Sequence, residues 1–385
     1  MKRLALLMVM ACALAAPAAA APYFVYVGSY TGGKSTSKGI YAWRFDTASG
    51  AITPMGLVAE TPNPAYVCTS PNSRHLYTGN WQDKGAPDGD PFVDAYAIDG
   101  KTGKLTFLNK ASAGGEDTNQ VVCDPSGKVV IAINYGAHHP GQHGAGIAAL
   151  SIGSDGKVSE PFYVDLHEGT PLSQRQTSGA HTHGLVFSKD RKFAFVADLG
   201  LDRIYTYHFD AAKGQMSPFD PPFITVAAGS GPRRLQLHPN GKFLYINHET
   251  DSKVSVFQVN GGNLKEIQQI STLPADYKGR NSTAEIAIDK AGKYLYVSNR
   301  GNDSIAVYKV DPSSGLLTIQ EFVPSGGKAP RNIMFDATGR YLFAANQSSG
   351  NVVVFRQDSS TGHLTVTGQE LKMDQPGSVA FARAQ

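Results

Sequence analysis

An internal repeat constrains the fold of this chain more than any other feature of its sequence. An apolar run, a tight turn rich in Gly, Asp or Asn, and a second apolar run recur along the chain, for example at residues 187–198, 237–246, 288–297 and 335–344. Turn residues between two strand-like runs predict a β-hairpin. A third alternating run and a short fourth follow the hairpins, and four strands per repeat are typical of a propeller blade.

The repeats can be counted at the end of each second strand. The equivalent positions are Ser29, Asn80, Asn134, Asp198, His248, Asn299 and Asn346, at intervals of 51, 54, 64, 50, 51 and 47 residues. The sequence therefore predicts an all-β fold, a seven-bladed β-propeller with four-stranded antiparallel blades around a central channel. The widest interval predicts an insertion around residues 167–182. The run at 377–381 resembles one more inner strand, and we expect it to close the ring against the first blade.

The N-terminus has the pattern of a secretion signal. Two basic residues precede a short apolar run, Leu4–Leu14, and small residues follow it at 15–21. The apolar run is too short to span a bilayer as a mature helix. We therefore expect a cleaved signal peptide over residues 1–21, a propeller domain over 22–385, and a periplasmic or secreted protein with no membrane association after cleavage.

Charge and cysteine content exclude some classes of function. The formal net charge is +3 over 385 residues, which gives no electrostatic footprint for nucleic acid. Two cysteines, Cys68 and Cys123, lie outside the predicted signal. The alternatives are a disulfide and two separate buried thiols. Because the two positions are one residue out of step in the repeat, we expect their side chains to point to opposite faces, which favours separate thiols.

Propeller geometry decides which residues can meet. The start of each inner strand and the end of each second strand lie on one face of the ring, so their residues converge on one mouth of the channel. Polar and titratable side chains gather at these positions: Asn134, His181, His183, Asp198, Arg233, Glu249, Glu285, Arg300, Arg331 and Gln347. Burying that many charges is costly unless they pair or bind a ligand, which points to a functional site.

The candidate residues divide by role. Four of them, His183, Arg233, Glu249 and Arg300, are the hardest to explain as core packing, because they are charged or titratable side chains at one mouth of the channel. The other six are predicted to bind substrate, and for Asp198 a structural role in bonding backbone at a strand end is the alternative. Arg234 is expected at the surface or in a hairpin. The loop histidines His138, His139 and His143 lack the spacing of a zinc site, so no metal and no other cofactor is expected.

These residues resemble the seven-bladed propeller lactonase family, which includes propeller-type 6-phosphogluconolactonase and carboxymuconate cyclase. The similarity covers nearly the whole mature chain, with its best matches at His181-Thr182-His183, residues 197–203, Gly231-Pro232-Arg233, Ala284-Glu285-Ile286 and residues 297–301. The resemblance implies that His183, Arg233, Glu249 and Arg300 are the catalytic groups. The chain departs from the family pattern at Trp81, Ala180 and Arg234, which bears on substrate identity.

The resemblance implies hydrolysis of a sugar lactone or a related lactone. Arg233 and Arg300 would hold a carboxylate or the developing oxyanion. Of Glu249 and His183, one would activate water and the other would protonate the leaving alkoxide. A carboxymuconate-type cycloisomerase, a non-catalytic periplasmic anion-binding propeller and a lactonase with a channel metal are the alternatives. The expected partner is a small lactone or carboxylate, and the expected state is a monomer.

Overall fold

The structure is a computed structural model that describes residues 22–81, 91–136, 144–173 and 179–385. The predicted signal peptide and the three loop histidines, His138, His139 and His143, lie outside the described residues. Within the described ranges the chain forms 28 strands and no helix, so the all-β prediction is confirmed. No helix in these ranges has the length and hydrophobicity needed to cross a membrane.

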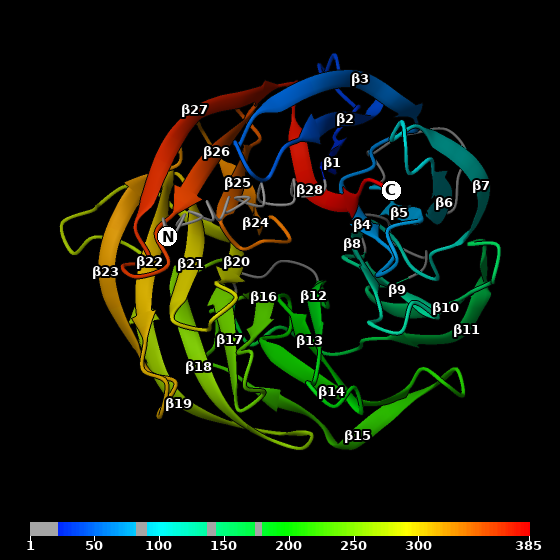
Figure 1. The fold of residues 1–385 in the computed structure, drawn as a ribbon. Coiled ribbons are helices and arrows are strands. Elements are labelled where there is room, and N and C mark those ends of the chain that lie inside the picture. Colours follow the sequence, from blue (N-terminus) through cyan, green and yellow to red (C-terminus); the bar gives the residue numbers. More distant parts are fainter. Residues whose placement is uncertain (1–21, 82–90, 137–143, 174–178) are drawn as a thin grey trace, which may run out of the picture.

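The strands form seven sheets of four antiparallel strands, arranged in a ring (Figure 1). The inner strands are β4 (Tyr66–Thr69), β8 (Thr118–Cys123), β12 (Thr182–Phe187), β16 (Pro232–Leu237), β20 (Ser282–Ile288), β24 (Pro330–Phe335) and β28 (Pro376–Arg383). The second strands are β1 (Tyr23–Ser29), β5 (His75–Gly79), β9 (Val129–Asn134), β13 (Phe193–Asp198), β17 (Phe243–His248), β21 (Tyr294–Arg300) and β25 (Tyr341–Asn346).

The outer half of each blade consists of a third and a fourth strand. The third strands are β2 (Gly39–Phe45), β6 (Phe92–Ile98), β10 (Gly146–Ile152), β14 (Arg203–Asp210), β18 (Lys253–Asn260), β22 (Ser304–Val310) and β26 (Asn351–Gln357). The fourth strands are β3 (Ile52–Glu60), β7 (Leu105–Ser112), β11 (Val158–Leu166), β15 (Gln215–Thr225), β19 (Asn263–Ser271), β23 (Leu317–Pro324) and β27 (Leu364–Lys372). Four strands per blade and seven blades agree with the count from the repeat.

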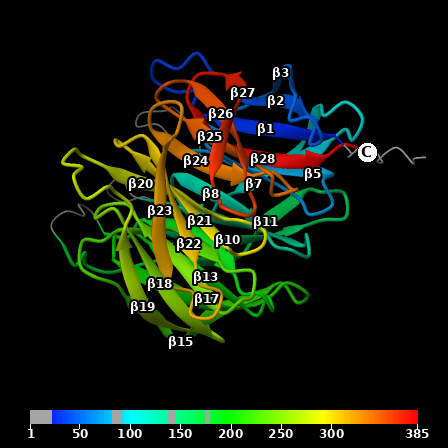
Figure 2. The same ribbon diagram turned by 60° about the vertical axis from the view of Figure 1, so that its left-hand side comes forward.

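The C-terminal strand closes the ring, as predicted. β28 pairs antiparallel with β1, with Tyr23 opposite Arg383, and the first blade has the strand order β28-β1-β2-β3. The two strands lie side by side in Figure 2. The first and last strands thus belong to one sheet, and β28 supplies the inner strand of the first blade. The predicted insertion lies between β11 and β12, at the joint of the third and fourth blades.

The blades pack face to face through apolar side chains. One buried cluster joins the third and fourth blades through Ile131, Ile133, Leu185 and Val196. Full burial of such a side chain contributes about 1.5–3 kcal/mol relative to exposure, so the blade interfaces supply much of the stability of the ring. Around the ring, the front face of each blade packs on the back face of the next.

This packing corrects the prediction for the two cysteines. The Sγ atoms of Cys68 and Cys123 lie 3.2 Å apart, and both residues are free thiols that are partly buried. They were expected to point apart because they are one position out of step in the repeat. In neighbouring blades, however, a front face meets a back face, so residues of opposite parity are the ones that face each other.

Candidate active site

The side chains at the channel mouth are positioned by β-bulges. The pairing of inner and second strands skips one residue in five blades, at Asn119, His183, Arg233, Arg331 and Gly377. In β20 it skips both Ala284 and Glu285. A bulge leaves the extra residue unpaired and changes the direction of its side chain. The β-bulges place three predicted site residues at the channel mouth: His183, Arg233 and Arg331.

The residues that follow the second strands complete the mouth. One position beyond those used for counting stand Tyr30, Trp81, Tyr135, Leu199, Glu249, Arg300 and Gln347. The first three blades therefore contribute aromatic side chains, and the fifth and sixth contribute a carboxylate and a guanidinium. The aromatic residues were absent from the predicted site. Their common register position was the signal that could have identified them.

The charged half of the mouth is centred on Glu249. Its Oε2 lies 2.6 Å from Nε of Arg233 and 3.0 Å from Nη2 of Arg300. Arg233 is only 1% exposed and also donates through Nη1 to the carbonyl of Ala284. The side chains of Glu249 and Arg300 are 28% and 17% exposed, so both remain accessible from the mouth. Arg300 is held in addition by a 2.6 Å hydrogen bond from Nη2 to Oγ of Ser282.

Electrostatics keep Glu249 ionised. Burial favours the neutral acid, but the positive charges of Arg300, Arg233 and Arg331 outweigh it and lower the pKa of Glu249 to about 2. Among the residues that the structure describes, no carboxylate forms a salt bridge with Arg331, whose guanidinium carbon lies 5.1 Å from the centroid of the Tyr30 ring. The mouth therefore carries an excess of positive charge.

His183 is uncharged at neutral pH. The residue is 3% exposed, and burial together with Arg233, Arg234 and Arg331 holds its pKa well below the usual value. Within the described part of the chain, its Nδ1 has no hydrogen-bond partner. A neutral imidazole donates one hydrogen bond and accepts another, but it lacks the second proton that an imidazolium can give as an acid.

An aromatic wall faces the charged half. Tyr135 stacks on His181 with ring centroids 4.3 Å apart, and its edge meets His183 at 5.6 Å. Trp81 lies 5.6 Å from Tyr135, and Tyr30 lies 6.4 Å from Trp81. These rings run from the first blade to the fourth. The mouth thus offers flat apolar surfaces on one side and cations on the other.

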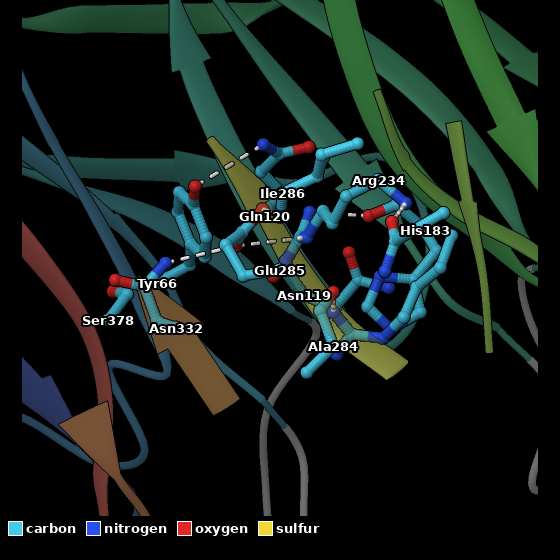
Figure 3. A network of polar contacts seen from close by, with 12 residues as sticks. Tyr66, Asn119, Gln120, His183, Arg234, Ala284, Glu285, Ile286, Asn332 and Ser378 are labelled. Atoms are coloured by element: carbon cyan, nitrogen blue, oxygen red, sulfur yellow. Dashed lines mark hydrogen bonds and ion pairs between the residues drawn. The ribbon is translucent and has the colours of Figure 1, made fainter. Parts of the chain in front are cut away.

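Arg234 and Glu285 are both buried and belong to one network of polar contacts, which we call the floor of the channel (Figure 3). Arg234 is 4% exposed, which corrects the prediction that it is a surface residue. It donates through Nη1 to the carbonyl of His183 and through Nη2 to that of Asn119, at 2.5 and 3.2 Å. Its Nε lies 3.5 Å from Oε2 of Glu285, which accepts a 2.9 Å hydrogen bond from Asn332. The predicted substrate ligand Glu285 therefore already has buried partners.

The remaining predicted substrate ligands are placed differently. Asn134 is fully buried, and its amide bonds the carbonyl of Ala113 and the hydroxyl of Thr118, both at 2.8 Å. Gln347 is partly exposed after β25. The structure therefore gathers six predicted residues at one mouth: His181, His183, Arg233, Glu249, Arg300 and Arg331. Asn134 and Asp198 support the strands behind them.

Asp198 fixes the insertion that precedes β12. Its Oδ2 lies 2.8 Å from Nδ1 of His167, and its Oδ1 accepts the backbone N–H groups of His181 and Leu201 at 2.9 and 3.0 Å. On its other side, His167 lies 2.8 Å from the hydroxyl of Tyr207. This buried network sets the position of His181 at the mouth.

We expect Asp198→Ala to lower the free energy of unfolding by about 3–5 kcal/mol, because it leaves a buried histidine and two buried N–H groups without their hydrogen-bond acceptor. Urea denaturation followed by intrinsic fluorescence measures the loss. Asp190→Ala, at an exposed hairpin turn, serves as the matched control and should change stability by less than about 1 kcal/mol. Equal effects at the two positions would contradict a role for Asp198 in this network.

Across residues 22–81, 91–136, 144–173 and 179–385, no group of three or more His, Cys, Asp or Glu side chains is placed to hold a metal ion.

Fold and site together define a class: a seven-bladed propeller whose channel mouth carries arginines, a carboxylate and a neutral histidine. The family model described as "Lactonase, 7-bladed beta-propeller" matches residues 24–381. The chain belongs to this family, which makes it an enzyme of the lactone-hydrolysing class.

Individual relatives agree with this membership. The chain is 33% identical to 6-phosphogluconolactonase of Bacillus subtilis (strain 168) over 315 residues, which cover 81% of this chain and 84% of that protein. A putative 6-phosphogluconolactonase from Bacteroides fragilis superimposes with a TM-score of 0.84 at 30% identity, over 95% of this chain and 99% of that one. The periplasmic gluconolactonase of Pseudomonas aeruginosa superimposes with a TM-score of 0.86 at 29% identity, over 94% of this chain and 100% of that one. The resemblance inferred from the sequence is confirmed.

Proposed function

We propose that the chain hydrolyses a sugar lactone, of the gluconolactone or phosphogluconolactone type, at the mouth formed by the bulge residues. The names of the relatives support this substrate class. The observation that carries the proposal is the ionised Glu249 held between Arg233 and Arg300. A site that only binds anions needs the arginines alone, and the carboxylate among them would weaken it.

Glu249 is the general base in this proposal. It is ionised and accessible, whereas His183 is more deeply buried. The shortest contacts of both arginines go to Oε2, and we assign Oε1 to the attacking water. As the water oxygen bonds to the lactone carbonyl carbon, its proton passes to Glu249. The low pKa of Glu249 makes it a weak base at rest, but the negative charge that develops on the carbonyl oxygen during the attack offsets the arginines and strengthens it.

Arg300 and Arg331 stabilise the oxyanion that forms on the carbonyl oxygen. Arg233 is nearly inaccessible and already bonds Glu249 and the Ala284 carbonyl, so its role is to position the base. When the tetrahedral intermediate collapses, the ring C–O bond breaks and the leaving oxygen takes the proton back from Glu249. His183, being neutral, orients a substrate hydroxyl. The aromatic wall provides surfaces for the apolar faces of a sugar ring.

The proposal extends to where the protein works. We propose that residues 1–21 are a signal peptide, that residues 22–385 are the mature propeller, and that the mature protein is a periplasmic monomer. The basic and apolar pattern of the first residues supports export, as does similarity to a periplasmic gluconolactonase. A periplasmic sugar lactone then fits this protein better than a cytosolic one.

A substrate screen tests the proposal. The mature chain is assayed by proton release against gluconolactone, phosphogluconolactone and muconolactone, with spontaneous hydrolysis subtracted and with a chelator in parallel. We expect turnover of at least one sugar lactone that the chelator leaves unchanged. Turnover of muconolactone alone would favour the cycloisomerase. Saturable binding of sugar acids without turnover of any lactone would favour a binding protein.

The pH dependence tests whether the base titrates as an ordinary histidine does. The active form of Glu249 is the carboxylate, which is present above its pKa of about 2 and is lost only as the pH falls through that value. The pKa of His183 also lies well below the usual one. We therefore expect kcat/KM to stay level between about pH 5 and about pH 8, where an ordinary histidine would titrate near 6.5. A fall in kcat/KM near that pH would instead indicate that the base is a histidine with an ordinary pKa.

A further inference from the structure

The two cysteines meet across a blade boundary. Cys68 lies in β4 of the second blade, and Cys123 is the last residue of β8 in the third blade. Their Sγ atoms are 3.2 Å apart, although 55 positions separate them in the chain. Both residues line a cavity of about 410 Å³ on the inner side of the ring, below the floor formed by Arg234 and Glu285. They are therefore accessible to small reagents that enter this cavity.

We propose that Cys68 and Cys123 are a disulfide-forming site that crosslinks the inner strands of the second and third blades. A disulfide joins sulfur atoms at about 2.05 Å, so the two atoms must approach each other by only about 1 Å. The front-to-back packing of the blades places them on facing surfaces. The proposal goes beyond the proposed function, because the pair lies at the turn end of the inner strands, away from the catalytic mouth.

The reaction requires an oxidant, which we specify as a small disulfide. The thiolate of one cysteine attacks a sulfur of the oxidant, whose S–S bond breaks and releases one thiol. The second cysteine then attacks the mixed disulfide, forms the Cys68–Cys123 bond and releases the second thiol. Two electrons and two protons pass from the protein to the oxidant. Burial raises the pKa of the Cys123 thiol, which suits a structural crosslink better than a reactive nucleophile.

Thiol counting tests the proposal directly. The mature chain is reduced, freed of reductant, treated with oxidised glutathione, unfolded in guanidinium and alkylated with iodoacetamide. We expect no alkylated cysteine and one crosslinked peptide pair containing residues 68 and 123, whereas the reduced sample should show two alkylated cysteines. Cys68→Ser should leave Cys123 without its intramolecular partner. Two alkylatable thiols after oxidation, stable glutathione adducts or intermolecular dimers in the wild type would overturn the proposal.

A stability readout shows whether the crosslink constrains the ring. Closing a long loop by a disulfide restricts the unfolded chain. We expect reductant to lower the melting temperature of the oxidised wild type, and to leave that of the Cys68→Ser/Cys123→Ser variant unchanged. Lactonase kcat/KM should be the same in both redox states, so failure of this proposal and failure of the proposed function are distinguishable. A wild-type melting temperature that does not respond to reductant would count against the crosslink.

Discussion

Glu249→Gln should lower kcat for lactone hydrolysis by about 10²–10⁴-fold, the range expected when a general base is removed. The amide has nearly the shape of the carboxylate and can still accept hydrogen bonds from Arg233 and Arg300. It cannot take the proton of the attacking water. Progress curves with subtraction of spontaneous hydrolysis measure the effect, and KM should change far less than kcat.

A matched control exists for this variant. The side chain of Glu321 on β23 is 27% exposed and contacts His363, so its exposure is comparable to that of Glu249. Glu321→Gln should retain the wild-type kcat. Because Glu249→Gln leaves buried Arg233 without its counter-ion, its melting curve is recorded in parallel. A folded Glu249→Gln protein with full activity would refute Glu249 as the base and return the role to His183.

Arg300→Ala should reduce kcat/KM by about 10²–10³-fold, as expected when one donor to a developing oxyanion is lost. The residue is 17% exposed, so its removal disturbs packing less than removal of the fully buried Arg233 would. Loss of the Arg300 charge, the charge that lowers the pKa of Glu249 most, should also raise that pKa. The decrease of kcat/KM at acidic pH should therefore shift to higher pH, into the range that can be measured.

The split between kcat and KM decides how Arg300 acts. Stabilisation of the transition state predicts a loss in kcat, whereas holding a carboxylate or phosphate of the ground state predicts a rise in KM alone. Comparison of a neutral with a phosphorylated lactone separates these cases. Arg356→Ala, at an exposed position on β26, is the control and should behave as wild type. An effect confined to KM for the phosphorylated lactone would assign Arg300 to substrate binding.

The fold was predictable from the sequence because each blade repeats the same local signals. Hairpin turns, alternating apolar runs and the spacing of positions such as Asp198 and Asn299 fixed the number of blades and the closure by residues 377–381. These signals are local, and their repetition makes the count robust. Even the joint that carries the insertion could be located from a single wide interval.

The site was only partly predictable, because register details do not follow from local pattern. Nothing in the sequence marks His183, Arg233 or Arg331 as a bulge residue, and a shift by one position separates the mouth from the floor. Arg234 illustrates the consequence, since the residue next to Arg233 lies in a different layer. The expectation that the two cysteines point apart was wrong because facing surfaces belong to different blades, a relation that exists between repeats and not within one.

The bulges at the start of the inner strands allow the site to diversify one position at a time. A bulge residue has no partner across the ladder, so exchanging its side chain leaves the pairing of the flanking residues intact. His183, Arg233 and Arg331 stand on separate blades, and each can change without altering the register of the others. The propeller therefore provides a fixed scaffold with one exchangeable side-chain position per bulge. Substrate preference can be redesigned by substituting one bulge residue at a time, without changing the scaffold.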